Sequence, residues 1–183
     1  MSTSQPTTSF AEVIESSLQG WKAQCWNWDE LPEHGSIVTI PSGQRTLYGI
    51  VYEMNMGSHD ASRTVFAYKK TEEDLKRDHP HIFEFIRSTF QCALLGYSEN
   101  GSIRYHTAPT PPKIHAFVHT PSLEELRSFF AQEHYLHSLF SFEDQLQSVD
   151  DLLLALLEQL AKKGILTNTV ALSSDDLPTI QTE

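Results

Sequence analysis

The chain has 183 residues, of which 39% are hydrophobic and 20% are charged, so it can bury a core and suits one compact domain or one domain with an appendage. Its 13 Lys and Arg against 24 Asp and Glu give a formal net charge of -11, which argues against direct binding to nucleic acid or to an anionic membrane surface. No apolar run is long enough for membrane insertion, and two cysteines without a CxxC pair favour a reducing, cytoplasmic location.

The N-terminal part is predicted to form short strands after a polar start. Residues 1–9 lack the basic and apolar regions of a signal peptide and are expected to be flexible. FAEVIES (10–16) alternates imperfectly between apolar and polar residues, and WKAQCW (21–26) alternates almost strictly. SIVTI (36–40) is rich in β-branched residues and is predicted to be the next strand.

TLYGIVYEM (46–54) is the strongest strand pattern in the chain. Its continuous apolar character predicts burial on both faces or a place in a barrel wall. Gly49 inside it predicts a bulge or a sharp bend, as barrel strands often need. RTVFAY (63–68) is predicted to be a further short strand.

A helical segment is predicted to interrupt the strands. Thr71 reads as the N-cap of EEDLKRD (72–78), whose acidic first turn is explained by the helix dipole. Pro80 suits the first position of a second helix, HIFEFIRS (81–88). The shared face of that helix is expected to consist of Ile82, Phe83 and Ile86.

A hairpin and a proline-rich crossing follow. FQCALLGY (90–97) is predicted to be a strand, and Asn100-Gly101 is the strongest short hairpin signal. HTAPTPPKIHAFV (106–118) cannot lie in a central strand, because proline lacks a backbone donor and fixes φ. We predict a stiff rim that crosses a barrel end and delivers IHAFV (114–118), with His115 inside it, as the next strand.

The C-terminal part is predicted to be helical. Ser122 and Glu125 form a capping box ahead of LEELRSFFAQ, and Ser148 caps DDLLLALLEQLAKK (150–163). The apolar face of the second helix is wide enough to cover the chain's own barrel or to bind a partner. That face consists of Val149, Leu152, Leu153, Leu156, Leu157 and Leu160.

The predicted fold class is therefore α+β: a small, mostly antiparallel β-barrel with an inserted helical segment and a C-terminal helical extension. The predicted organisation is a flexible N-terminus (1–9), the barrel domain (10–120), the helical extension (121–166) and an acidic tail (167–183).

The segments FAEVIESS, AQCW, LYGIVYEM, HPHIFEFIRS, LLGY and PTPPKIHAFV occur in an order that resembles the HAS-barrel family, over residues 10–118. This small barrel is named for its presence in HerA-type helicase ATPases and in the catalytic subunits of ATP synthase. The resemblance implies a compact barrel that in larger relatives precedes a ring-forming ATPase and helps neighbouring subunits assemble. None of the eight glycines is followed by lysine, so the P-loop is absent, no bound nucleotide is expected, and the chain is predicted to be a stand-alone barrel.

Nine histidines raise the question of a metal site. His79 and His81 straddle Pro80, and His134 and His137 are one helical turn apart. A structural zinc site usually needs four nitrogen or sulfur ligands at short paired spacings, and the chain has neither HExxH nor paired cysteines. Surface histidines are the favoured interpretation, and no metal ligand or cofactor is predicted.

Catalytic candidates are equally sparse. Cys25 and Cys92 lie in apolar runs without a basic neighbour and are predicted to be buried and structural. No carboxylate or nucleophile is near His115 in the sequence. Asp60 and Arg63 can bind a polar ligand, but a solvated loop is favoured. No catalytic residue is predicted.

The three tryptophans, Trp21, Trp26 and Trp28, have two interpretations. Exposed aromatic residues on an OB-like barrel can stack single-stranded bases, but that function needs a basic groove, and only Lys22 is nearby. A barrel core and its closing rim are therefore favoured, and no nucleic-acid partner is expected.

The sequence predicts a non-enzymatic assembly or adaptor module that docks on another protein or on a second copy of itself. One alternative is a barrel that senses a small molecule or nucleotide through Trp or Tyr residues at its mouth. Another is an enzyme that uses His115 or Cys92, which would require a deep pocket holding one of them together with a carboxylate.

Overall fold

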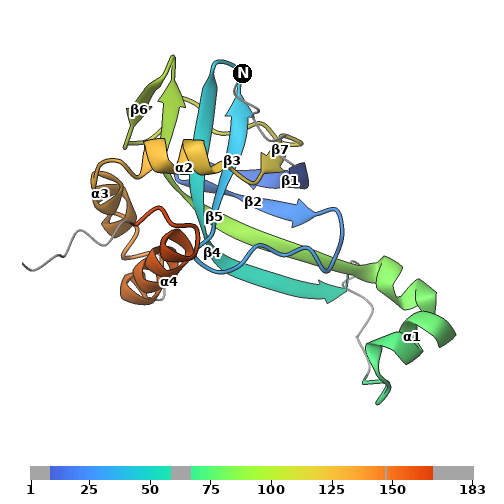
Figure 1. The fold of residues 1–183 in the computed structure, drawn as a ribbon. Helices are drawn as coiled ribbons and strands as arrows, with labels where there is room; N and C mark the ends of the chain where they lie inside the picture. The colour runs from blue at the N-terminus through green and yellow to red at the C-terminus, as the bar shows by residue number, and fades with distance from the viewer. Residues whose placement is uncertain (1–8, 59–66, 147, 167–183) are drawn as a thin grey trace, which may run out of the picture.

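A computed structural model describes residues 9–58, 67–146 and 148–166. It contains seven strands and a few short helices (Figure 1). The strands are β1 (Ser9–Ser16), β2 (Gly20–Cys25), β3 (Ile37–Ser42), β4 (Arg45–Ser58), β5 (Ile86–Glu99), β6 (Ser102–Arg104) and β7 (Phe117–His119). The helices are α1 (Glu72–Asp78), the 3-10 helix η1 (Pro80–Phe85), α2 (Leu123–Phe129), α3 (Tyr135–Phe140) and α4 (Val149–Lys162).

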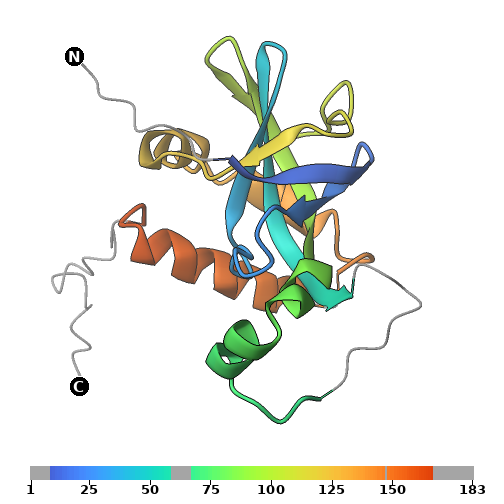
Figure 2. The same ribbon diagram turned by 90° about the vertical axis from the view of Figure 1, so that its right-hand side faces the viewer.

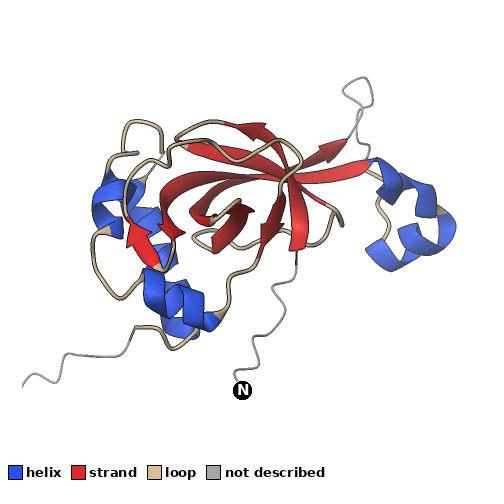
Figure 3. Cartoon of the chain, turned by 90° about the horizontal axis from the view of Figure 1, so that it is seen from above, coloured by secondary structure: helices blue, strands red, loops and turns tan. Residues whose placement is uncertain are grey.

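Six strands close into an antiparallel barrel. Their order is β1–β2–β5–β4–β3–β7, and β7 pairs back onto β1 to complete the circle. β6 is an additional strand that pairs with β5 outside this circle. The sheet curls round on itself, with α2, α3 and α4 on one side and α1 with η1 at the far end of the molecule (Figure 3). The predicted α+β barrel is confirmed.

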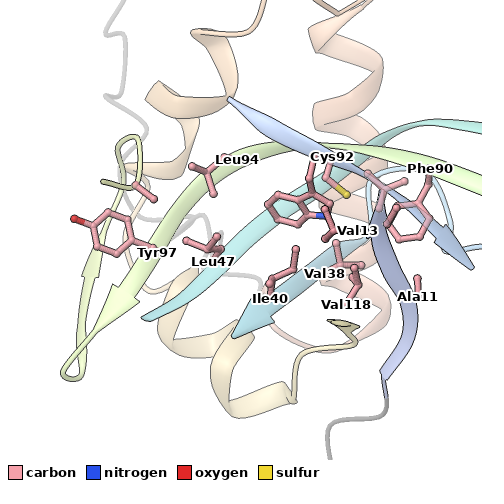
Figure 4. Close-up of a cluster of buried hydrophobic side chains, with 14 of the residues drawn as sticks. Ala11, Val13, Val38, Ile40, Leu47, Phe90, Cys92, Leu94, Tyr97 and Val118 are labelled. Atoms are coloured by element: carbon pink, nitrogen blue, oxygen red, sulfur yellow. The ribbon is translucent and has the colours of Figure 1, made fainter. Parts of the chain in front are cut away.

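Side chains fill the interior of the barrel (Figure 4). β2 shows why the sequence folds this way: Trp21, Ala23 and Cys25 alternate with polar residues and point into the core. Trp21 faces β4 at Gly49, where an added Cβ would lie 2.4 Å from the indole Cη2 atom. The β4–β5 pairing shifts register between Tyr48 and Gly49, so the predicted irregularity at Gly49 is confirmed.

The C-terminal helices cover the outer face of β3, β4 and β5 (Figure 2). Leu152, Leu156 and Leu160 of α4 are buried against the chain's own barrel, and an added Cβ on Gly35 would lie 2.7 Å from the Ala155 Cβ atom. The leucine face is therefore occupied by the chain itself and does not remain free for a partner.

Two predicted helix signals are confirmed at the starts of the C-terminal helices. Ser122 and Glu125 form both hydrogen bonds of a capping box before α2, and the Ser148 side chain accepts from the backbone N–H of Asp151 before α4. The acidic tail lies outside the described residues, and β1 already begins at Ser9, within the predicted flexible N-terminus.

β4 and β5 are 14 residues long and extend beyond the barrel as a two-stranded arm that carries α1 and η1 (Figure 1). The prediction of a helix over 81–88 is wrong in its second half, because 86–88 already pair with β4 as strand. Only a 3-10 helix forms before them. Of the predicted strand over 63–68, residues 63–66 lie outside the described part, and 67–68 are not strand.

The proline-rich crossing joins β6 to β7 along the barrel end. Ala108 and Pro112 are buried, and Ala108 belongs to the interior cluster. The prediction that His115 lies in a strand is wrong, since β7 begins at Phe117 and His115 occupies a turn with a φ of 67°. At the hairpin before the crossing, Asn100 and Gly101 have φ of 51° and 77°, as a primed turn requires.

Within the described residues, every helix is too short or too polar to cross a lipid bilayer.

Candidate interaction surface

In the described part of the chain, the C-terminal helices do not bury the outer faces of β1, β2 and β7. Among the described residues, the buried outer cluster draws its strand members from β3, β4 and β5. The wall of β1, β2 and β7 lies on the other side of the molecule from α4 (Figure 1). This wall is therefore the part of the barrel that is open to contact with another molecule.

Two large aromatic side chains meet on this wall. Trp26 follows the inward-facing Cys25 at the end of β2, and Phe117 precedes the inward-facing Val118 in β7. β1 lies between these two strands, so the rings reach each other across it. Their centroids are 5.2 Å apart at an interplanar angle of 88°, yet Trp26 is 50% exposed and Phe117 is 51% exposed. We call these two residues the aromatic pair.

A polar pair lies beside the aromatic pair. Glu12 of β1 is the register partner of Phe117, and its carboxylate contacts Nδ1 of His115. The His115 backbone N–H donates to the Val13 carbonyl at 2.9 Å, and the Val13 N–H donates to the Ala116 carbonyl at 2.9 Å. These bonds tie the turn to β1 and hold the His115 ring at the surface.

No carboxylate is close to His115 in the sequence, but the fold brings the Glu12 carboxylate into contact with it. The two residues are 103 positions apart, so the sequence order conceals the pair. The His115 side chain is 77% exposed, and solvent therefore screens its interaction with Glu12. The pair is suited to polar contacts at the edge of an interface.

The cysteines lie in the barrel interior, as predicted. Burial, with a smaller contribution from Glu30, raises the pKa of the Cys25 thiol to about 12, and burial raises the pKa of Cys92 well above its ordinary value. Cys92 also lines a surface hollow together with Glu15, but its side chain points into the core (Figure 4). A thiol in this environment stays protonated near neutral pH.

The tryptophans take three different roles. Trp21 is buried in the barrel interior, as predicted for a core residue, whereas Trp26 belongs to the aromatic pair. Trp28 stacks on Phe83 of η1 with centroids 5.2 Å apart, and Nζ of Lys76 lies 5.8 Å from the Trp28 ring centroid. Trp28 therefore holds the arm against the loop that follows β2.

Of the predicted histidine pairs, only the first shows a contact between its two rings among the described residues. His79 and His81 have ring centroids 6.0 Å apart, and His134 contacts the ring of Tyr105. His137 lines a hollow that Tyr105 also lines. In the three described segments, no three His, Cys, Asp or Glu side chains come together to hold a metal ion.

The polar loop containing Asp60 and Arg63 lies outside the described residues. The acidic first turn of α1 is capped by Thr71 as predicted, since the Thr71 hydroxyl accepts from the Asp74 backbone N–H at 3.2 Å.

The sequence analysis identified Trp26 but missed Phe117 and Glu12. The signal for Phe117 was its place next to an inward-facing valine, because neighbours in a strand point to opposite faces. No local signal placed Glu12 beside His115, since that contact depends on the pairing of β1 with the crossing.

No model of a known protein family matches the chain, and no curated protein matches it either. Membership of the HAS-barrel family therefore stays a prediction, whereas the barrel fold itself is observed.

Proposed function

We propose that the protein is a non-enzymatic assembly or adaptor module that binds another protein through the outer wall of β1, β2 and β7. The single observation that carries this proposal is the aromatic pair, two adjoining rings that each leave half of their surface in water. Aromatic side chains are enriched at protein interfaces and dominate the binding energy there. Exposed Trp and Phe together on one wall are also costly to leave uncovered.

The surroundings of the pair support the same function. Glu12 and His115 supply a polar rim next to the apolar centre, which is the usual arrangement of an interface. A cytoplasmic location and the HAS-type assembly role belong to this proposal as well. The sensing alternative stays a prediction, and the packing of Trp21 into the barrel interior does not favour it.

The test is affinity capture of the tagged protein, followed by measurement of the affinity of each recovered partner. The variant Trp26→Ala/Phe117→Ala is expected to lower that affinity by about 30-fold or more, since interface hot spots contribute about 2 kcal/mol or more. Leu154→Ala is the matched control, because Leu154 is 60% exposed on α4, away from this wall. Circular dichroism should show the same fold in all three proteins.

Self-association is the second arm of the test. Light scattering of the full chain across micromolar concentrations distinguishes a second copy from a different partner. A protein that is strictly monomeric and whose captured partners bind the double variant as well as the wild type would refute the proposal.

A further inference from the structure

A grooved surface lies where the wall of β1, β2 and β7 meets the C-terminal helices. Three hollows meet at Leu146 within the described part of the chain, with volumes of about 190, 290 and 210 Å³. The first extends along the β1–β2 turn and β5, and the second lies between β4 and the start of α4. The third lies beside Phe140 and Val149. We call this surface the Leu146 groove.

The floor of the groove is partly apolar. Tyr52, Phe142 and Leu152 contribute to it together with Leu146, and Phe140 at one end is 46% exposed. Each hollow is smaller than the roughly 300–1,000 Å³ of a typical small-molecule pocket. Their sizes and their arrangement around one leucine suit successive side chains of a larger partner.

The rim of the groove is acidic. Among the described residues it carries five carboxylates and one ammonium group, that of Lys22, whose Nζ lies 3.7 Å from the Glu15 carboxylate. Glu53 is held in place, because its two oxygens accept from the Asn55 side chain at 2.8 Å and from the Gln91 side chain at 2.6 Å. The carboxylates of the rim are those of Glu15, Glu53, Glu143, Asp150 and Asp151.

These charges decide between the possible occupants. A second copy of the chain carries a net charge of -11, and residues 167–183 contain Asp175, Asp176 and Glu183 but no Lys or Arg. Both would be repelled by the rim, as would nucleic acid and anionic lipid. A small polyamine matches the charge but leaves the apolar floor in water.

We propose that the Leu146 groove binds a Lys- or Arg-rich amphipathic segment of another protein, with its apolar side chains in the hollows and its cations on the rim. The segment is recognised by both kinds of contact, so neither charge nor apolarity alone suffices. The groove shares no residue with the aromatic pair, and the two proposals therefore fail independently.

The probe is a fluorescently labelled 14-residue peptide that repeats Leu-Lys-Lys-Leu-Leu-Lys-Leu, titrated with the full chain and followed by fluorescence anisotropy. The expected result is saturable binding that weakens as salt is raised, because the cations contact a partly exposed acidic rim. An oligolysine of equal charge and spermine serve as probes without apolar side chains, and both are expected to bind at least about tenfold more weakly.

Charge-matched variants locate the binding. Glu53→Gln/Asp151→Asn removes two rim charges and is expected to weaken binding of the amphipathic peptide by about three- to tenfold. Glu124→Gln/Glu133→Gln removes the same charge from exposed positions that do not line the groove, and binding should stay within about twofold. Phe140→Ala tests the apolar part and is expected to weaken the amphipathic peptide while leaving spermine unaffected.

Four outcomes would overturn the proposal. The first is peptide binding that does not saturate, and the second is equal binding of oligolysine, which would reduce the groove to a diffuse acidic surface. The third is an equal effect of the rim variant and its charge-matched control. A change in sedimentation of the full chain on Phe140→Ala, without any peptide, would assign the surface to a second copy instead.

Discussion

The contact between Gly49 and Trp21 gives the sharpest test of the barrel interior. In Gly49→Ala the new Cβ would lie 2.4 Å from Cη2 and 2.7 Å from Cζ2 of Trp21, and 3.0 Å from Cβ of Cys92. Because Trp21 is buried among core side chains, the ring cannot move away without displacing them. Overpacking of this kind costs about 1–3 kcal/mol.

Gly57→Ala is the matched control, since Gly57 is in the same strand and a Cβ there meets nothing within 4 Å. It is expected to stabilise the protein by about 0.4–1 kcal/mol through the lower entropy of the unfolded chain. The two alanine variants should therefore differ by roughly 1.5–4 kcal/mol in free energy of unfolding. For a chain of this size that corresponds to a difference of roughly 3–15 °C in Tm.

The assay is urea unfolding followed by circular dichroism, with m-values compared to confirm that the transitions expose similar surface. Trp21→Phe removes the two ring atoms that the new Cβ meets, so Gly49→Ala should cost less in the Trp21→Phe background, by about 1 kcal/mol or more. If Gly49→Ala unfolds at the same urea concentration as Gly57→Ala, Trp21 does not pack against β4 as described.

Three further predictions concern the helices, the thiols and the arm. Leu156→Ala should lower the free energy of unfolding by about 2–5 kcal/mol, whereas Leu154→Ala should change it by less than about 0.5 kcal/mol; equal effects would show that α4 does not bury its leucines on the barrel. Because burial raises the pKa values of Cys25 and Cys92, Ellman's reagent at pH 8 should react with neither thiol until urea unfolds the chain, and rapid labelling of the native protein would contradict this. Phe83→Ala should speed hydrogen exchange in 72–85 without changing exchange in the barrel strands, and an unchanged arm would show that stacking on Trp28 does not hold it.

The barrel was predictable because its strands carry local signals. WKAQCW alternates strictly, and the buried positions of β2 follow that alternation. Residues 86–88 were mispredicted because the spacing of Ile82, Phe83 and Ile86 also fits a helix, and short apolar runs are ambiguous between helix and strand. The pairing of Gly57 with Arg87 across the arm decides the outcome, and that contact is not visible in the local pattern.

The candidate surface could be predicted only in part. The alternation in β2 and β7 places Trp26 and Phe117 on the outside, but only the strand order brings them together over β1. The same holds for Glu12 and His115, whose contact joins the two ends of the barrel sequence. The direction of a side chain is a local property of its strand. Which side chains of different strands become neighbours on a barrel wall depends on how the sheet closes into the barrel.

The closed barrel also explains why the exposed position of the aromatic pair indicates a function. Within the barrel, β4 has both faces buried, with Leu47 and Val51 in the interior and Tyr48 and Ile50 under the helices. The continuous apolar run of this strand therefore has a structural reason. β1, β2 and β7 have only their inner faces in the interior core, so their outward positions are expected to be polar.

Glu12, Lys22 and Gln24 follow this expectation, but Trp26 and Phe117 do not. The described fold offers no burial that accounts for two half-exposed rings at these outward positions. Burying the exposed half of each ring against a partner would contribute about 1 kcal/mol or more per ring. The departure from the strand pattern therefore points to contact with another molecule, and the Trp26→Ala/Phe117→Ala variant tests that contact directly.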